Sequence, residues 1–281
     1  MRILVTGAKG QLGWDVSKRL APDHDVVRFD VEQMDLATPN TIGGILFKEE
    51  PDLIIHCGAF TAVDKAEEEK DICHRINAEA TRAIAAQAVE SGARMIYIST
   101  DYVFDGTKPE PYEIGDVPHP INFYGQTKLE GELAVKELMK RYQIIRTSWV
   151  FGANGNNFVK TMMRLGKERD VIRVVSDQVG SPTYTVDLAN LIVEMVRSDR
   201  YGTYHATNEG YCSWHRFATE IIRKKGLKAK IESVATEDYP TKALRPKNSR
   251  LSKRSLDEAG FQRLPTWQDA LERYLQETMG V

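Results

Sequence analysis

The spacing of apolar residues predicts strands and helices that alternate along the first half of the chain. Short runs in which almost every residue is apolar are separated by longer stretches with apolar positions three or four residues apart. The runs predict strands at 2–6, 26–29, 52–57, 93–99 and 143–148, and the longer stretches predict helices at 11–20, 72–91 and 123–141. Strands that are apolar on both faces are typical of a parallel sheet covered by helices on both sides. We therefore expect an α/β fold with a doubly wound parallel sheet.

The pattern after residue 150 is less regular. It predicts helices at 157–166, 186–197 and 213–225, strands at 171–175, 203–205 and 229–234, and two short helices after the extended stretch 239–249. No linker rich in Pro, Gly and Ser separates the two halves. We expect residues 1–150, together with about 171–200, to form one domain. Residues 151–281 would form mainly a smaller C-terminal lobe, with a cleft above the carboxyl ends of the strands.

A glycine-rich turn joins the first predicted strand to the first predicted helix. Gly7, Gly10 and Gly13 follow a G-x-x-G-x-x-G spacing, which differs from the G-x-G-x-x-G of many dehydrogenases. Glycine lets the backbone approach a pyrophosphate, and a helix N-terminus attracts that anion. Asp30 ends the second predicted strand, at the distance where an acidic side chain binds the ribose hydroxyls of adenosine. Each feature alone is also ordinary turn or surface chemistry, but together they predict a Rossmann-like dinucleotide-binding domain.

Tyr124 and Lys128 form a Tyr-x-x-x-Lys motif in a predicted helix. Residues four apart share a helix face, so the Lys128 ammonium would lie beside the phenol of Tyr124, lower its pKa and let it act as a general acid toward a carbonyl oxygen. Thr100 and Asp101 follow the fourth predicted strand, where a hydroxyl and a carboxylate can bind a substrate. The alternative without catalysis is that Tyr124 and Lys128 lie on a solvated helix face, and that Thr100 and Asp101 only cap a helix or form a turn. The order of glycine turn, Thr100 and Tyr-x-x-x-Lys favours hydride-transfer chemistry.

The composition narrows the class of protein. The 281 residues include 38 Lys and Arg against 40 Asp and Glu, a net charge of −2, so no basic surplus favours nucleic acid. No apolar run approaches the roughly 20 residues that cross a bilayer, and no signal-peptide pattern precedes the first strand. The three cysteines are widely spaced and fit neither a disulfide framework nor a zinc site. We therefore expect a cytoplasmic protein that binds a small molecule, with no nucleic acid and no membrane partner.

Longer motifs extend these signals over essentially the whole chain. They are T-A-V-D-K-A at 61–66, S-T-D-Y-V-F at 99–104, Y-G-Q-T-K at 124–128, R-T-S-W-V at 146–150, G-N-N-F at 155–158, D-Q-V-G-S-P-T at 177–183 and R-P-K-N-S-R-L at 245–251. On these residues the chain resembles the extended short-chain dehydrogenase/reductase family, and within it the reductases of 4-keto-6-deoxy sugar nucleotides. The resemblance implies an NADPH- or NADH-dependent oxidoreductase that converts dTDP-4-dehydro-β-L-rhamnose to dTDP-β-L-rhamnose for cell-surface polysaccharide.

The same resemblance implies roles for individual residues. Thr100, Tyr124 and Lys128 would form the catalytic set. The cofactor would be lined by Gly7, Gly10, Gln11, Leu12, Asp30, Asp35, Leu36, Ala59, Phe60, Thr61, Tyr124 and Lys128. The deoxysugar nucleotide would contact Val63, Thr100, Asp101, Trp149, Asn157 and Arg245. Judged by position alone, Trp149 would be a packed core aromatic and Arg245 a solvent-exposed side chain. For each residue, this interpretation stays open beside the role that the resemblance implies.

Members of this family are often homodimers, some with Mg²⁺ held between subunits by acidic side chains. Asp15, Asp187 and Glu277 occupy the corresponding stretches here, although acids far apart in sequence are by default solvated surface charges. Two of the three are the shorter Asp, which weakens the case for a metal that bridges subunits.

Two other functions stay open at this point. The first is a reductase of another 4-keto-6-deoxy sugar nucleotide, a choice that depends on the C-terminal lobe. The second is a non-catalytic NADP-binding regulatory subunit, against which the presence of Thr100, Tyr124 and Lys128 weighs. Lys9 departs from the family pattern by adding a positive charge to the glycine turn, where it would alter cofactor preference.

Overall fold

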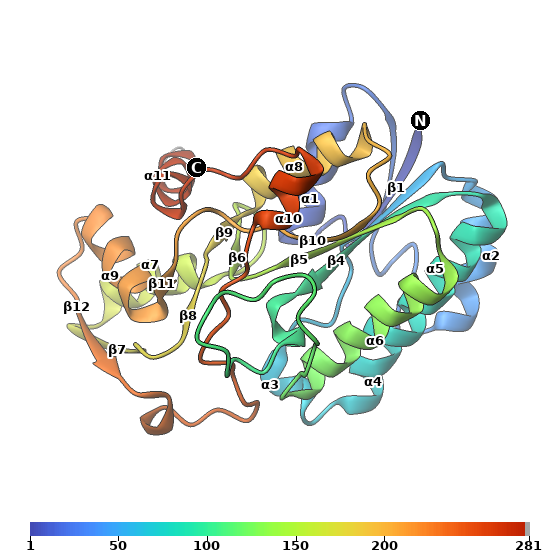
Figure 1. Cartoon of the computed structure of the whole chain (residues 1–281). Coiled ribbons are helices and arrows are strands. Elements are labelled where there is room, and N and C mark those ends of the chain that lie inside the picture. Colours follow the sequence, from blue (N-terminus) through green and yellow to red (C-terminus); the bar gives the residue numbers. More distant parts are fainter. Residues whose placement is uncertain (279–281) are drawn as a thin grey trace.

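The computed structural model describes residues 1–278, and a six-stranded parallel sheet forms its centre (Figure 1). The strands lie in the order β10-β5-β4-β3-β1-β2. Their bounds are β1 Arg2–Thr6, β2 Asp25–Phe29, β3 Leu53–His56, β4 Arg94–Thr100, β5 Tyr142–Thr147 and β10 Gly202–His205. Every neighbouring pair is parallel, so all carboxyl ends meet at one edge. The predicted doubly wound α/β fold is confirmed.

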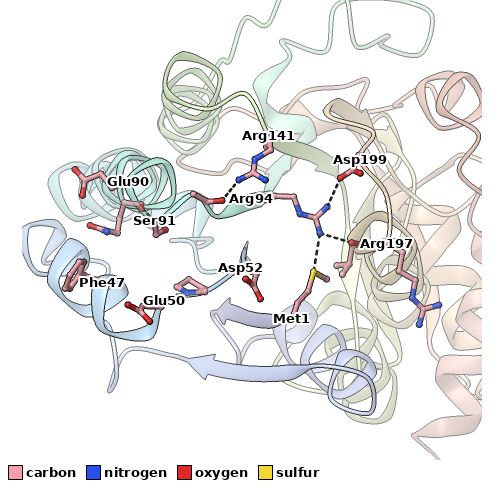
Figure 2. Close-up of a pocket in the computed structure, with 14 residues that line it drawn as sticks. Met1, Phe47, Glu50, Asp52, Glu90, Ser91, Arg94, Arg141, Arg197 and Asp199 are labelled. Atoms are coloured by element: carbon pink, nitrogen blue, oxygen red, sulfur yellow. Dashed lines mark hydrogen bonds and ion pairs between the residues drawn. The ribbon is translucent and has the colours of Figure 1, made fainter.

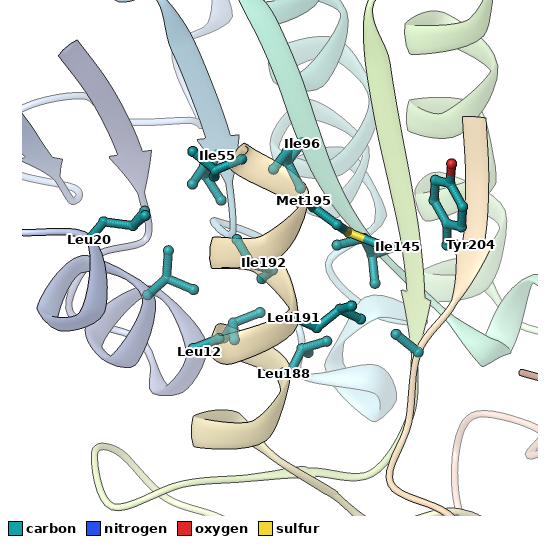
Figure 3. Packing of buried hydrophobic residues seen from close by; sticks show 14 of the residues in the cluster. Leu12, Leu20, Ile55, Ile96, Ile145, Leu188, Leu191, Ile192, Met195 and Tyr204 are labelled. Carbon is teal, nitrogen blue, oxygen red and sulfur yellow. The ribbon is translucent and has the colours of Figure 1, made fainter. Parts of the chain in front are cut away.

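Helices cover both faces of this sheet because its strands are apolar on both faces. The covering helices are α1 (Gln11–Leu20) and α8 (Thr185–Val196) on one face, and α2 (Pro39–Glu49), α5 (Ala80–Ser91) and α6 (Phe123–Leu138) on the other. Ile55 and Ile96 are fully buried on the side of the sheet that faces Ile192 and Met195 of α8 (Figure 3). Ile54 and Tyr97, one position along the same strands, are buried against the opposite helices. The alternation of side chains along each strand therefore builds two separate cores.

One predicted helix is divided in the structure. The stretch expected to form a single helix over 72–91 consists of α4 (Lys70–His74), a π-helical turn η1 (Arg75–Glu79) and α5. Asn77 in that turn accepts a hydrogen bond from the backbone N–H of Phe60 (2.8 Å). A π-helical turn is commonly found near a functional site, and here it fixes the loop that follows β3. The helix α2 was not among the sequence-based expectations.

Most of the remaining elements build a separate core beside the sheet. They are the strand pairs β6 (Val150–Phe151) with β9 (Thr183–Tyr184), β7 (Val171–Val175) with β12 (Lys230–Val234) and β8 (Val179–Gly180) with β11 (Cys212–Ser213), and the helices α7 (Phe158–Glu168), α9 (Trp214–Lys224) and α11 (Trp267–Glu277). The other short elements lie outside this core: α10 (Arg254–Ala259) packs on the sheet, α3 (Val63–Ala66) contacts α6, and the turns are η2 (Asp101–Val103) and η3 (Thr236–Asp238). Phe151, Phe217, Trp267 and Tyr274 fill the centre of this core. Of the segment 171–200, α8 packs on the sheet whereas β7 pairs with β12 in the separate core. The division into a dinucleotide-binding domain and a substrate lobe stays a prediction.

No helix within residues 1–278 combines the length and apolarity needed to cross a bilayer.

Candidate active site

A cleft of about 790 Å³ opens at the carboxyl edge of the sheet, between the glycine turn, β4, β5 and the segment after residue 147. Most of the residues named from sequence line it. They are Gly7, Gly10, Gln11, Leu12, Asp30, Asp35, Leu36, Ala59, Thr61, Thr100, Asp101, Tyr124, Lys128, Trp149 and Asn157. Residues from both halves of the chain therefore meet in one cavity.

Three of the residues named for the cofactor or the sugar nucleotide do not line the cleft. Phe60 is held through its backbone by Asn77, and Val63 opens the short helix α3. Arg245 makes two hydrogen bonds to the carboxylate of Asp64, at 2.7 and 3.0 Å. The positive charge of Arg245 is thus already paired, because an arginine fork and a carboxylate fit each other at two points.

The glycine turn brings the N-terminus of α1 against the cleft. Gly7 has a φ of +63°, and a Cβ there would lie 2.8 Å from Gly58. A Cβ on Gly13 would lie 2.2 Å from the carbonyl oxygen of Gly7, so only glycine lets the helix pack this closely on the turn. No side chain caps α1, whose first N–H groups lack partners within the helix. These groups are free to bind a phosphate.

Tyr124 and Lys128 lie one turn apart on α6, as their spacing predicts. Asn122 caps this helix by accepting a hydrogen bond from the N–H of Gly125 (2.8 Å). The Nζ atom of Lys128 donates to the carbonyl oxygen of Ile98 (2.8 Å) and lies 4.2 Å from the centroid of the Tyr97 ring. Lys128 is 2% exposed, so its ammonium lies almost out of water.

Burial dominates the electrostatics of this pair. It lowers the pKa of Lys128 to about 7, while Glu132 acts in the opposite direction. Burial also raises the pKa of Tyr124, and the hydroxyl of Thr100 partly opposes the shift. The sequence led us to expect a Tyr124 pKa lowered by Lys128. In the structure the phenol is instead more firmly protonated than a free phenol, because its desolvation outweighs the hydrogen bond with Thr100, and the nearby Asp101 acts in the same direction as burial.

Two buried oxygen atoms in the cleft have no hydrogen-bond partner within residues 1–278. They are Oδ2 of Asp101 and the hydroxyl of Thr147, on side chains that are 3% and 5% exposed. The other carboxylate oxygen of Asp101 accepts from the hydroxyl of Thr100 (3.0 Å), and burial raises the pKa of Asp101 to about 6. A buried polar atom without a partner is costly, so a ligand that supplies one is favoured here.

Sequence reasoning did not identify Thr147. It lies opposite Thr100 in the register of β4 and β5, so the two side chains reach the cleft side by side. Its place in R-T-S-W-V, two residues before Trp149, was its only signal in the sequence.

Trp149 is partly buried and also lines the cleft. It is therefore neither a fully packed core aromatic nor a free surface for the sugar. Its ring stacks on that of Trp214 with centroids 3.6 Å apart, and its φ of +48° is unusual for a residue with a side chain. A Cβ on Gly180 would lie 2.7 Å from the Trp149 ring, so the backbone passes directly against the indole. One face of the indole is therefore packed, while another part is available to the cleft.

Asn157 lines the cleft but is used by the protein itself. It caps α7 through Oδ1, which accepts from the N–H of Lys160 (3.0 Å). Its amide nitrogen donates to Gln11 (3.1 Å) and to the carbonyl oxygen of Gly152 (2.8 Å). The side chain thus ties the C-terminal segment to the glycine turn.

The model of the RmlD substrate binding domain matches residues 1–279 of the chain. The chain belongs to the RmlD family. The spore coat polysaccharide biosynthesis protein SpsK of Bacillus subtilis (strain 168) is 42% identical over 277 residues, covering 98% of this chain and 97% of that protein. The dTDP-4-dehydrorhamnose reductase of Escherichia coli (strain K12) is 40% identical over 292 residues, covering 99% and 98%.

A solved structure of an RmlD-family protein is closely similar to the whole chain. The crystal structure of dTDP-4-dehydrorhamnose reductase from Bacillus anthracis str. Ames in complex with NADP has a TM-score of 0.95 and 44% identity, covering 98% of this chain and 99% of that one. The predicted membership of the extended short-chain dehydrogenase/reductases is confirmed.

The three acids named from the sequence for a Mg²⁺ site are each held by another side chain of the chain. Asp187 is paired with Arg273 (2.8 Å), Asp15 accepts from the hydroxyl of Thr185 (2.5 Å), and Glu277 accepts from the hydroxyl of Tyr184. Within residues 1–278 no three acidic, His or Cys side chains are arranged to hold a metal ion. The carboxylate of Asp187 is already neutralised by an arginine, so these residues do not fit Mg²⁺ within one chain.

A second cavity, of about 770 Å³, lies at the amino ends of the strands, away from the candidate active site (Figure 2). Arg94 donates to the carbonyl oxygens of Val196 and Ser198, both at 2.9 Å, and Arg141 donates to the carbonyl oxygen of Gly92. Its arginines are already paired, and none of the residues named from sequence line it. We assign no function to this cavity.

Proposed function

We propose that this chain is a reductase that converts dTDP-4-dehydro-β-L-rhamnose to dTDP-β-L-rhamnose with NADPH or NADH. The observation that carries the proposal is one cleft that unites the glycine turn with Thr100, Tyr124 and Lys128, in a chain that matches the RmlD family over almost its whole length. Relatives at about 40% identity carry the name of this reductase, and a similar structure holds NADP.

The residues of the cleft fit a dinucleotide. The uncapped N-terminus of α1 would hold the pyrophosphate, and Asp30 would face the adenosine ribose. The rest of the cofactor would be lined by Asp35, Leu36, Ala59 and Thr61, with Phe60 beside them in sequence but outside the cleft, and Lys128 would bind the nicotinamide ribose. When bound, the dinucleotide supplies the hydride that reduces the carbonyl carbon.

The catalytic residues would supply the proton and the orientation. Tyr124 would donate its phenolic proton to the sugar C4 oxygen as the hydride reaches C4, so that the carbonyl becomes an alcohol. Its raised pKa keeps the phenol protonated at neutral pH, so that it holds a proton to donate. Thr100, whose hydroxyl proton is donated to Asp101 in this structure, would turn that proton to the same oxygen and orient it. Lys128 would hold a positive charge near the phenolate that remains.

The substrate side of the cleft would be built by residues of both halves. Asp101 would accept a hydrogen bond from a sugar hydroxyl through its unpaired Oδ2 atom. Trp149 would pack on the sugar or base, with Asn157 also lining the cleft, whereas Val63 would reach the substrate only from outside this cleft. Arg245 would bind the diphosphate only by exchanging its partner Asp64.

We also propose that the chain works in the cytoplasm and forms a homodimer, as a biosynthetic reductase of this family. Size-exclusion chromatography with light scattering measures the oligomeric state directly.

Product analysis tests the proposed function. The protein is incubated with NADPH and a panel of 4-keto-6-deoxy sugar nucleotides, and the products are identified by NMR. We expect turnover of the L-rhamnose precursor to dTDP-β-L-rhamnose. A different epimer would identify another sugar reductase, and binding of dinucleotide without turnover of any substrate would favour a non-catalytic binding subunit.

A further inference from the structure

Three charged residues meet at the adenosine end of the cleft. The backbone N–H of Lys9, in the glycine turn, donates to Oδ2 of Asp30 (2.8 Å). The Nζ atom of Lys9 lies 2.5 Å from Oε1 of Glu32. Asp30 is further held by the N–H of Val31 (3.0 Å), so its carboxylate is fixed between the turn and the end of β2.

Lys9 is the cation closest in position to Asp30 among the residues that line the cleft. The other lining lysine, Lys128, lies on α6 and bonds the end of β4 instead. Arg28 is exposed on β2 and does not line the cleft. Any anionic group added to the adenosine ribose would therefore find its counter-charge on Lys9.

We infer that Glu32 is a specificity-determining residue, because it holds the Lys9 ammonium and so limits how strongly the 2′-phosphate of NADPH is bound relative to the free hydroxyl of NADH. This inference rests on the proposed function, since it assumes that a dinucleotide occupies the cleft. Glu32 itself does not line the cleft, and it acts through Lys9.

The charges of the three side chains give the direction of the effect. Asp30 and Glu32 are anions and Lys9 is a cation, so the three carry one net negative charge at neutral pH. The hydrogen bond between Lys9 and Glu32 raises the pKa of Lys9 and lowers the pKa of Glu32, so both side chains stay charged. A 2′-phosphate must draw Lys9 away from Glu32 and lie near two carboxylates. The 2′-hydroxyl of NADH carries no such cost.

The Lys9–Glu32 pair is suited to an exchange of partners. The two side chains are 63% and 53% exposed, and exposed ion pairs are weak. Lys9 can therefore turn to a phosphate without loss of a buried contact. The pair sets a moderate preference between the two cofactors, and removal of either member changes that preference without changing the fold.

Binding measurements test this inference independently of catalysis. The dissociation constants of NADPH and NADH are measured by fluorescence titration for the wild type, Glu32→Gln, Lys9→Ala and the double variant. Glu168→Gln serves as a matched control, because Glu168 forms an equally exposed ion pair with Arg164 on α7, at a site that does not line the cleft.

We expect Glu32→Gln to tighten NADPH binding about three- to fivefold, as the release of an exposed ion pair allows, with NADH changed less than about twofold. Lys9→Ala should weaken NADPH alone, and the double variant should resemble Lys9→Ala. The increase in NADPH affinity of Glu32→Gln should become smaller at higher salt concentration, because salt screens the charges. Glu168→Gln should bind both cofactors as the wild type does.

Two outcomes would overturn the inference. One is an unchanged NADPH affinity in Glu32→Gln. The other is an equal gain in the Lys9→Ala background, which would mean that Glu32 acts as a general negative charge rather than through Lys9. A protein that shows the expected binding pattern but reduces no keto sugar would contradict the proposed function and leave this inference standing.

Discussion

The buried ion pair behind the active site gives a prediction whose size follows from the structure. Glu132 and Arg146 are 0% and 1% exposed, and two hydrogen bonds of 2.7 and 2.8 Å join them. Ser99, next to the proposed catalytic Thr100, donates its hydroxyl to the same carboxylate (2.6 Å). Glu132→Gln would leave the Arg146 cation buried without its counter-charge. Such a change typically costs about 3–5 kcal/mol.

The expected loss is large enough to measure in two ways. Urea unfolding should give a free energy of unfolding lower by about 3–5 kcal/mol, and calorimetry a Tm lower by about 6–15 °C. Glu168→Gln, in the exposed pair with Arg164, should change stability by less than about 0.5 kcal/mol. Replacing both partners, as Glu132→Leu with Arg146→Met, should recover part of the loss, because no charge then remains buried.

The same pair predicts a pH dependence with a definite sign. Burial alone would raise the pKa of Glu132, but the hydrogen bond and charge of Arg146 lower it overall. A carboxyl whose folded pKa is lowered stabilises the fold above its unfolded pKa and loses that contribution as the pH falls through the folded value. The difference between wild type and Glu132→Gln should therefore be full at neutral pH and shrink in acid. A Tm for Glu132→Gln within about 2 °C of the wild type at pH 7 would refute the reasoning.

Three further substitutions test the site. Tyr124→Phe should keep the fold and the dinucleotide affinity but lower kcat by about 100-fold or more, because general acid catalysis supplies this much; a kcat near the wild-type value at neutral pH would exclude the role. Trp149→Ala should raise KM for the sugar nucleotide about tenfold with little change in dinucleotide affinity; early melting would instead identify a packing residue. The wild type should use NADH and NADPH with kcat/KM values within about tenfold of each other, and Asp30→Ala should shift the ratio toward NADPH; a thousandfold preference in the wild type would contradict the placement of Asp30.

Local patterns of apolar residues in the sequence predicted most of the fold. The apolar runs at 52–57 and 93–99 become β3 and β4, because strands buried on both faces need apolar residues at every position. The spacing of Tyr124 and Lys128 likewise placed both residues on one turn of α6. The division of the 72–91 helix by a π-helical turn carried no such signal, since it depends on the contact between Asn77 and the distant loop at Phe60.

The finer chemistry of the site depends on tertiary contacts that no local pattern contains. Spacing put Lys128 beside Tyr124, but the degree of burial, set by the surrounding helices, decides which way the pKa of Tyr124 moves. The pairing of Arg245 with Asp64 joins residues 181 positions apart. The family resemblance marked Arg245 as a contact of the sugar nucleotide, but it cannot reveal that a carboxylate of the same chain already pairs with its guanidinium.

Transfer of a deuterium label tests the central claim most directly. The protein is incubated with dTDP-4-dehydro-β-L-rhamnose and NADPH that carries deuterium at the transferable position of nicotinamide C4, and the product is examined by NMR. The account predicts dTDP-β-L-rhamnose with deuterium at sugar C4, formed by the wild type and at least about 100-fold more slowly by Tyr124→Phe. Recovery of unreduced sugar from the wild type, or a product with deuterium at another carbon, would contradict it.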